Sequence, residues 1–199
     1  MANERPSEDQ NHWRGGHGGS CYPRRVKLAG KRIVFVLPRQ GYREEEFDEP
    51  QRAAERAGGK VLVAGSCLDW ASGLAGGRRP PDLLLGAVRA DELDGLLFVG
   101  GYGASEYFAD RRAHALARAV LAAGKPVGAI CYAVSTLAAA GLLEGVEVSG
   151  HPDRADHLRA CGALLRDAPV TRSGSLLTGR DPAAARPFAA AWTDLLAEG

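Results

Sequence analysis

The stretch VGAICYAV (residues 127–134) decides the fold that this sequence predicts. Its first four residues follow the turn signal Gly124-Lys125-Pro126 and form a short apolar run that is typical of a buried β-strand. The Ala- and Leu-rich run from 133 to 140 is typical of a helix, and Gly141 marks its end. Cys131 therefore lies where a strand becomes a helix, which is the position of the nucleophile in a nucleophile elbow.

Cys131 allows two interpretations at this point. Ala129 and Ala133, two residues before and after it, are small enough to avoid collisions across a sharp strand-to-helix turn. A thiol at the N-terminus of a helix is expected to have a lowered pKa, which favours the nucleophilic thiolate. Free cysteines are also commonly buried as small apolar side chains. This stretch by itself leaves a reactive thiol and a structural cysteine both open.

The strand-then-helix pattern recurs along the chain. Apolar runs predict strands, and longer periodic runs that end near glycine predict helices. Expected strands cover residues 32–37, 60–64, 95–99, 127–130, 146–149, 163–170 and 175–178; expected helices cover 44–57, 110–123, 133–140, 153–160 and 182–197; loops cover 38–41 and 172–174, and a loop or small hairpin covers 65–81. This alternation predicts a doubly wound α/β fold, a flavodoxin-like sandwich with a mainly parallel sheet and helices on both faces.

Composition indicates one globular domain at residues 31–199. The chain has 199 residues, of which 45% are hydrophobic and 25% charged, and this suits a single domain with a sizeable core. Residues 1–30 are polar, rich in Gly, Arg and Asn, and without hydrophobic periodicity, so we expect a flexible tail. The net charge of +1 gives no argument for a nucleic-acid or anionic-membrane partner.

Targeting signals and cysteine spacing indicate the compartment. No apolar run approaches the roughly 18–20 residues that span a bilayer. The beginning of the chain, residues 1–6, lacks the apolar segment of a signal peptide. Four cysteines lie far apart in a chain too long to need disulfides, so we expect reduced thiols in the cytoplasm at Cys21, Cys67, Cys131 and Cys161.

The sequence shows no metal signature. His12, His17 and Cys21 match no tetrahedral zinc spacing, and His157 and Cys161, four apart on an expected helix, supply only two ligands. A solvated tail and a solvated helix face are the simpler interpretations. We therefore expect no bound metal.

Gly100-Gly101 follows the expected strand at 95–99, at the edge of the sheet where open α/β folds bind ligands. A diglycine allows close backbone approach, and its N–H together with that of Tyr132 would hold a developing oxyanion. The alternative is a tight strand-to-helix turn. The run from 100 to 105, Gly-Gly-Tyr-Gly-Ala-Ser, lacks the third glycine of a dinucleotide fingerprint, so no nucleotide cofactor is expected.

Two further groups are candidates for proton transfer. The segment Tyr42 to Pro50 carries five carboxylates, most of which we expect on a solvated helix surface. A carboxyl directed at Cys131 would be satisfied by sharing a proton with the thiol. His151, after the expected strand at 146–149, is a possible base for the same thiol, although an isolated histidine is more often structural.

Taken together, these segments resemble the PfpI/ThiJ family of the class I glutamine amidotransferase-like superfamily, which includes intracellular peptidases and the Parkinson-disease-associated deglycase. The resemblance covers about residues 31–197 and is nearest to a deglycase-like branch of mostly uncharacterised bacterial and archaeal proteins. It rests on Ile33 to Leu37, Tyr42 to Pro50, Leu96 to Gly101, Gly124 to Cys131 and Ala140 to Leu143.

The resemblance implies roles for the candidate residues. Cys131 is the implied nucleophile, and Glu46 matches the glutamate whose protonated carboxyl contacts the cysteine sulfur. The amides of Gly101, next to Gly100, and of Tyr132 match the oxyanion site, and His151 matches the active-site histidine of the deglycase-like branch. Family members are usually homodimers or larger, with the site near a subunit interface, so a homo-oligomer is implied.

The sequence departs from the peptidase branch at one position. That branch has a histidine base directly after the nucleophile, whereas this chain has Tyr132. Amide hydrolysis needs a proton delivered to the leaving amine, while addition of a thiolate to a reactive carbonyl does not. This favours a cofactor-independent cysteine enzyme for a small carbonyl compound, of glyoxalase or deglycase type. The alternatives are a hydrolase, hydratase or lyase of a biosynthetic pathway, a cysteine peptidase or amidase, and a redox-sensing or holdase protein.

Overall fold

The computed structural model describes residues 28–199, and at its centre is a seven-stranded sheet. The strand order is β11-β12-β8-β7-β1-β3-β6, and every neighbouring pair is parallel except β11 with β12. The strands are β1 (Arg32–Val36), β3 (Lys60–Gly65), β6 (Leu83–Leu84), β7 (Gly95–Phe98), β8 (Val127–Ile130), β11 (Val170–Ser173) and β12 (Leu176–Gly179).

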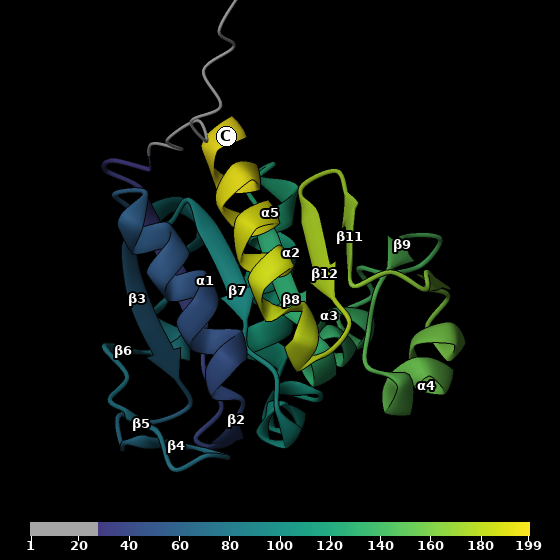
Figure 1. The fold of residues 1–199 in the computed structure, drawn as a ribbon, viewed down its shortest axis with the longest axis horizontal. Coiled ribbons are helices and arrows are strands. Elements are labelled where there is room, and N and C mark those ends of the chain that lie inside the picture. Colours follow the sequence, from purple (N-terminus) through teal and green to yellow (C-terminus); the bar gives the residue numbers. More distant parts are fainter. Residues whose placement is uncertain (1–27) are drawn as a thin grey trace, which may run out of the picture.

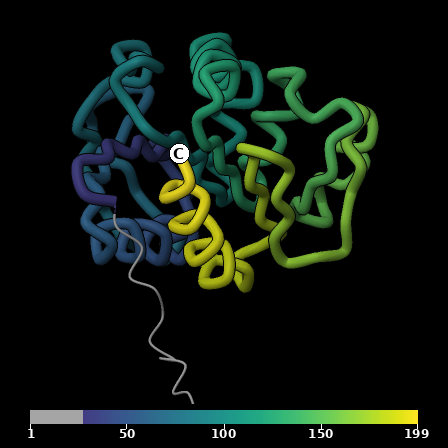
Figure 2. Tube along the Cα trace, turned by 90° about the horizontal axis from the view of Figure 1, so that it is seen from above, coloured from purple at the N-terminus to yellow at the C-terminus, as the bar shows by residue number. Residues whose placement is uncertain are grey.

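Helices cover both faces of this sheet, as Figures 1 and 2 show. On one face α1 (Glu44–Arg56) and α5 (Ala185–Glu198) lie side by side, and on the other lie α2 (Arg111–Ala122) and α3 (Val134–Ala139). A short helix, α4 (Ala155–Ala160), packs beyond the edge that carries β11. The prediction of a doubly wound, mainly parallel sheet with helices on both faces is confirmed.

Alternate residues of the central strands enter two separate cores. In β1, Ile33 and Phe35 join the core formed with α1 and α5, whereas Val34 and Val36 join the core formed with α2 and α3. Successive side chains of a strand point to opposite faces, so a strand covered on both sides must be apolar at every position. This explains why the run of buried residues from 33 to 37 is continuous.

A second, three-stranded sheet lies beside the carboxyl end of β1. It consists of β2 (Gln40–Tyr42), β4 (Ala71–Gly73) and β5 (Arg78–Arg79), with β4 and β5 forming an antiparallel pair. The small hairpin predicted within 65–81 is confirmed, but the prediction of a loop at 38–41 missed β2. The Glu44 carboxylate fixes this hairpin, because its Oε1 accepts hydrogen bonds from the N–H groups of Ala75 and Gly77.

Two predicted strands near the C-terminus were wrong in detail. Residues 146–149 do not join the main sheet, because β9 (Glu147–Val148) pairs only with β10 (Leu164–Leu165). The strand predicted over 163–170 is divided between β10 and β11. The loop predicted at 172–174 lies partly in β11, and the turn to β12 is made at Gly174, whose φ is 61°.

The folded domain begins earlier than residue 31. Leu28 is fully buried in the core with α1 and α5, and its N–H donates to the carbonyl of Ala57. Residues 1–27, which include His12, His17 and Cys21, lie outside the described part, so the flexible tail stays a prediction. Within residues 28–199 no helix combines the length and the apolar character needed to cross a membrane.

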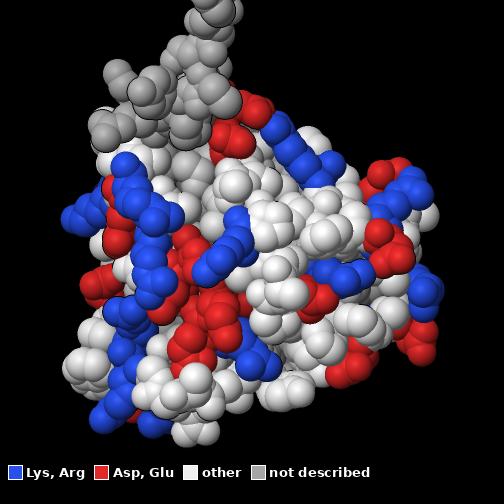
Figure 3. All heavy atoms as spheres, in the orientation of Figure 1, with Lys and Arg blue, Asp and Glu red and all other residues white. Residues whose placement is uncertain are grey.

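Acidic and basic side chains are interspersed on the face formed by α1 and α5, as Figure 3 shows. Ion pairs connect several of them, including Asp48 with both Arg52 and Arg79, and Glu49 on α1 with Arg186 on α5. Acidic and basic groups on this face are thus linked to one another by ion pairs.

Register places the candidate site at one edge of the sheet. Val36 pairs with Phe98, and Phe98 pairs with Ala129, so β1, β7 and β8 end at the same level. The chain segments that leave these three strands contain Glu46, Gly100-Gly101 and Cys131. These residues lie about 55 and 30 positions apart in sequence, and the parallel sheet brings them together.

Candidate active site

Cys131 occupies a strained turn between β8 and α3. Its φ is 61°, and it is the only residue other than glycine with a positive φ among residues 28–199. A left-handed conformation of this kind costs of order 1–3 kcal/mol and is found preferentially at functional sites. Ala129 and Ala133 are both buried, as the turn requires. The structure therefore has the strand-to-helix elbow that the sequence predicted.

Glu46 lies beneath this turn, in the first turn of α1, and is fully buried. Its carboxyl group lies against the Cys131 side chain and the N–H of Gly100, although neither oxygen has a partner in normal hydrogen-bond geometry. A side chain at Gly100 would overlap Oε2 of Glu46 and would approach the Cβ of Cys131 to 2.9 Å. Gly100 is thus required by the close contact between the carboxyl group and the cysteine.

Burial controls the protonation of both groups. It raises the pKa of Glu46 to about 8, and the contact with Cys131 and the positive charge of Arg43 only partly oppose it. Burial also raises the pKa of Cys131, and a negative charge on Glu46 would raise it further. The pair therefore retains protons at neutral pH, and the carboxyl group of Glu46 is mainly neutral there.

The expectation of a lowered pKa for Cys131 was wrong in sign. The sequence indicated a helix N-terminus but not the depth of burial, and Cys131 is 3% exposed. The helix that follows is also short, since a 3₁₀ turn at Cys131–Ala133 precedes α3, which has 6 residues. The N–H groups of Tyr132 and Gly101 do favour the thiolate, but less than burial disfavours it.

Two backbone N–H groups converge on the sulfur of Cys131. They belong to Tyr132, the next residue, and to Gly101, which follows β7. Gly101 has a φ of 94°, and a Cβ at this position would lie 2.7 Å from the backbone nitrogen of Arg43. Paired N–H groups beside a nucleophile are what an oxyanion site requires. The diglycine predicted from the sequence is needed at both of its positions.

His151 and Tyr132 form an aromatic wall beside the cysteine. The ring centroid of Tyr132 lies 4.8 Å from that of His151 and 5.0 Å from that of Tyr102. The Tyr132 hydroxyl donates to Oδ2 of Asp153 at 2.7 Å, and this hydrogen bond raises the pKa of Tyr132 to about 12. The tyrosine that replaces the histidine of the peptidase branch is therefore directed at Asp153.

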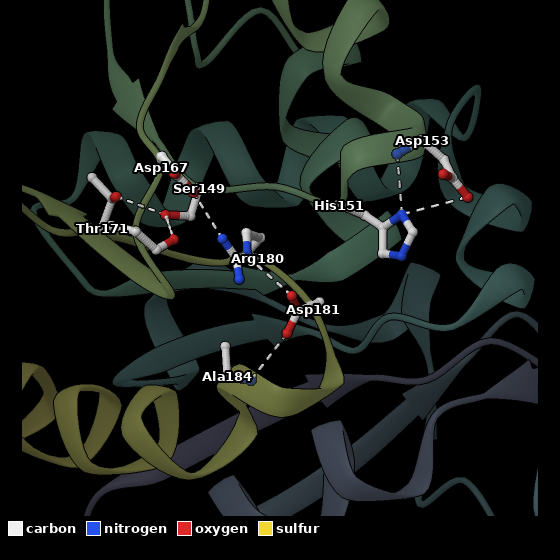
Figure 4. Close-up of polar contacts among 9 residues, drawn as sticks. Ser149, His151, Asp153, Asp167, Thr171, Arg180, Asp181 and Ala184 are labelled. Carbon is white, nitrogen blue, oxygen red and sulfur yellow. Dashed lines mark hydrogen bonds and ion pairs between the residues drawn. The ribbon is translucent and has the colours of Figure 1, made fainter.

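Asp153 also sets the orientation of His151, as Figure 4 shows. The backbone N–H of Asp153 donates to Nδ1 of His151 at 3.2 Å, while its carboxylate lies 3.6 Å from the same nitrogen. When Nδ1 accepts a hydrogen bond, the neutral ring carries its proton on Nε2. In this tautomer His151 can donate a hydrogen bond through Nε2. Asp153 has no signal in the sequence beyond the spacing His-Pro-Asp.

A buried hydroxyl cluster holds the backbone that leads to His151. The N–H of Ser149 donates to Oγ1 of Thr178 at 2.9 Å, and the Ser149 hydroxyl lies 2.8 Å from that of Thr171 (Figure 4). Nearby, Asp181 accepts a hydrogen bond from the N–H of Ala184 and pairs with Arg180. The hydroxyl contacts attach the segment that leads to His151 to β11 and β12, and the Asp181 contacts hold the turn at Pro182.

A small cavity opens at this point. Its volume is about 30 Å³, and it is lined by Arg43, Gly101, Tyr102, Cys131, Tyr132, His151 and Pro182. Such a volume admits only a few non-hydrogen atoms. A wider cleft of about 690 Å³ adjoins it at Tyr102 but does not include Cys131. The structure thus brings together all six candidates from the sequence, and adds Arg43, Tyr102, Asp153 and Pro182.

Metal-binding groups are not assembled in the described part of the chain. Residues 28–199 contain no group of three or more His, Cys, Asp or Glu side chains placed to hold a metal ion. The Sγ of Cys161 lies 4.0 Å from Nε2 of His157, and these two side chains share a helix face as the sequence indicated.

The sequence model of the DJ-1/PfpI family matches residues 31–195 of this chain. The chain belongs to the DJ-1/PfpI family. It is 28% identical over 149 residues to a protein of Pyrococcus abyssi named deglycase, covering 75% of this chain and 90% of the relative. It is 31% identical over 153 residues to YraA of Bacillus subtilis, and the match covers 75% of this chain and 89% of the relative. YraA is named as a candidate cysteine protease.

A solved structure of similar shape agrees with this assignment. The ThiJ/PfpI domain protein of Brachyspira murdochii superimposes with a TM-score of 0.82 and 32% identity, covering 84% of this chain and 97% of the other. The resemblance inferred from sequence is therefore confirmed. Relatives carry the names of enzymes, deglycase among them, so enzymatic activity belongs to the family.

Proposed function

We propose that this protein is a cofactor-independent cysteine enzyme that acts on a small reactive carbonyl compound, as a glyoxalase or deglycase does. The observation that supports it best is the conformation of Cys131, which is held at a φ of 61° against two N–H groups and a buried carboxyl group. A core cysteine would need none of these features. The deglycase name of several relatives, at 27–28% identity, agrees with this chemistry.

The proposed reaction starts with addition of the Cys131 thiol to an aldehyde carbon, which gives a hemithioacetal. The N–H groups of Gly101 and Tyr132 stabilise the oxygen while it is negatively charged. For a 2-oxoaldehyde, the ionised form of Glu46 takes the proton from the former aldehyde carbon and returns it to the neighbouring carbonyl carbon. The hydroxyl proton of the hemithioacetal passes to the oxygen on that neighbouring carbon, and a thioester results. Water then releases a 2-hydroxy acid and the thiol, so no external oxidant or reductant is consumed.

His151 supplies a hydrogen-bond donor in this scheme. Its Nδ1 accepts from Asp153, so Nε2 carries the hydrogen that is available to an oxygen in the cavity. Tyr132 contributes its backbone N–H and its ring, while its hydroxyl is bound to Asp153. Peptidase activity lacks this support, because no histidine follows the nucleophile to protonate a leaving amine.

A turnover screen tests this proposal. We expect wild-type protein to convert methylglyoxal to lactate, detected by NMR without added cofactor, and to leave fluorogenic peptide amides uncleaved. Cleavage of amides without conversion of 2-oxoaldehydes would support the peptidase or amidase alternative instead. If the protein converts neither 2-oxoaldehydes nor amides, the proposal fails. The alternative of a hydrolase or lyase in a biosynthetic pathway is then favoured.

The proposal includes a homo-oligomeric, cytoplasmic protein. Supporting the first point, three large apolar side chains are exposed on one segment, Leu68 at 57%, Trp70 at 55% and Leu74 at 42%. Exposed apolar patches of this kind often mark protein contacts. We expect sedimentation to show a dimer or larger species, and a monomer at micromolar concentration would contradict it.

A further inference from the structure

Arg43 is a partly buried cation in the cavity of Cys131, and the proposed reaction gives its side chain no role. It directly precedes α1, and its guanidinium Nε is buried without a hydrogen-bond partner. Within residues 28–199 no carboxylate lies within ion-pair distance of Arg43. Neighbouring arginines differ in this respect, since Arg39 pairs with Asp69, and Arg52 and Arg79 pair with Asp48.

The acidic residues next to Arg43 in sequence form no ion pair with it in the described structure. Glu44 directs Oε1 at the hairpin N–H groups, and Glu46 is mainly neutral because burial raises its pKa to about 8. A cation before the first turn of a helix is also disfavoured by the helix dipole. A side chain that breaks the local rules in a cavity with a candidate nucleophile indicates a functional reason.

Backbone contacts fix Arg43 next to the oxyanion site. Its N–H donates to the carbonyl of Gly100 at 3.1 Å, and its nitrogen lies so close to Gly101 that no side chain fits between them. The guanidinium therefore extends from a rigid point beside the two N–H groups that face Cys131. A planar guanidinium binds carboxylates through two parallel hydrogen bonds.

We propose that Arg43 binds an anionic group of the substrate, so that the preferred substrate is a 2-oxoaldehyde that carries a carboxylate. This inference rests on the proposed function and narrows it. The cavity of about 30 Å³ encloses little more than the reacting carbonyl groups, so the carboxylate lies toward its mouth, where Arg43 is partly exposed. Uncharged oxoaldehydes would then be poorer substrates.

A matched pair of substrates tests this. Both 4,5-dioxopentanoate and 2-oxopentanal have five carbons in a line, and they differ in the charge at the far end. We expect wild type to have the higher kcat/KM for the acid. Arg43→Gln should lower kcat/KM for the acid by about 10- to 100-fold, as is typical for loss of a charged hydrogen bond, and should change the value for 2-oxopentanal by less than about threefold.

The ratio between the two substrates is the decisive quantity. Loss of the Arg43 charge also acts on Glu46, but this effect applies to both substrates equally. Arg39→Gln is the matched control, because Arg39 is an exposed arginine that is paired with Asp69 outside the cavity, and it should leave the ratio unchanged. An equal fall for both substrates in Arg43→Gln would overturn the inference.

Binding without turnover separates this inference from the proposed function. Pentanoate and pentanamide have the chain length of the two substrates and differ in charge at the end that Arg43 would bind. Calorimetry should show that wild type binds pentanoate more tightly, while Arg43→Gln does not distinguish them. If no oxoaldehyde is converted but pentanoate binding depends on Arg43, the anion site stands and the proposed reaction fails. If 2-oxopentanal is converted and the two probes bind equally, the anion site is wrong.

Discussion

Replacement of Cys131 by alanine should reduce turnover of 2-oxoaldehydes by at least about 100-fold, and up to about 10⁴-fold, because the attacking group is lost. The N–H groups of Gly101 and Tyr132 remain in Cys131→Ala, but they have no bound intermediate to stabilise. Steady-state kinetics with methylglyoxal, or with the best compound from the turnover screen, would measure the effect.

Controls for this prediction use the other cysteines of the described chain. Cys67 and Cys161 are free and partly exposed, and neither lines the cavity. Cys161→Ala should therefore retain wild-type turnover. Circular dichroism and urea unfolding would show whether Cys131→Ala is folded. Retention of more than about a tenth of the activity by folded Cys131→Ala would contradict nucleophilic catalysis by this residue.

Oxidation of the wild-type protein tests the redox alternative. A sulfenic or sulfinic acid forms from a thiolate, and burial raises the pKa of Cys131. The two partly exposed cysteines face solvent more directly. We therefore regard selective oxidation of Cys131 as the weaker hypothesis, and mass spectrometry after mild peroxide would reverse this view if Cys131 were oxidised first.

The inner strands of the central sheet were predictable from sequence because they are largely buried on both faces. Continuous apolar runs such as residues 33–37 have no other common explanation when helices alternate with them. The error at residues 146–149 has a different cause. Val148 is fully buried, as the pattern indicated, but its strand pairs with β10, where Val148 lies opposite Leu165, outside the main sheet. An apolar pattern predicts burial and does not identify the neighbouring strand.

The candidate site was predictable in part. Cys131 and the diglycine follow from local rules for a sharp turn and for close backbone approach. Glu46 does not, because nothing local distinguishes it from Glu44 and Glu45, and only the family resemblance selected it. Arg43 has no signal in the sequence beyond its place in an acidic segment. Its unpaired state depends on where the other arginines and carboxylates lie, which only the folded chain determines.

Glu46→Gln should remove a pH dependence from the stability of the protein. The pKa of Glu46 rises from its ordinary value of 4.5 to about 8 on folding, mainly through burial. Between these two values the unfolded chain loses the proton while the folded chain keeps it, so the free energy of unfolding falls as pH rises, by up to about 1.4 kcal/mol per pH unit. Glutamine does not titrate, so this contribution is absent from the variant.

The comparison is made by urea unfolding at several pH values from 5 to 8. Stability of Glu46→Gln relative to wild type should increase toward pH 8, by several kcal/mol in total, and the difference should level off above that pH. Glu45→Gln is the matched control, because Glu45 is the adjacent, exposed residue in the same helix turn. Parallel pH profiles for wild type and Glu46→Gln would show that this carboxyl group has an ordinary pKa.

Activity and thiol reactivity should change in opposite directions in Glu46→Gln. Glutamine fills the same space but cannot transfer a proton, so kcat for oxoaldehydes should fall by about 10²- to 10⁴-fold. The negative charge of Glu46 is one cause of the raised pKa of Cys131, so its removal should lower that pKa. Alkylation of Cys131 by iodoacetamide above pH 8 should then be faster in the variant than in wild type. Slower turnover together with faster alkylation would show that Glu46 transfers a proton and, as a separate effect, lowers the reactivity of Cys131. A carboxyl group with a purely structural role would not produce both changes.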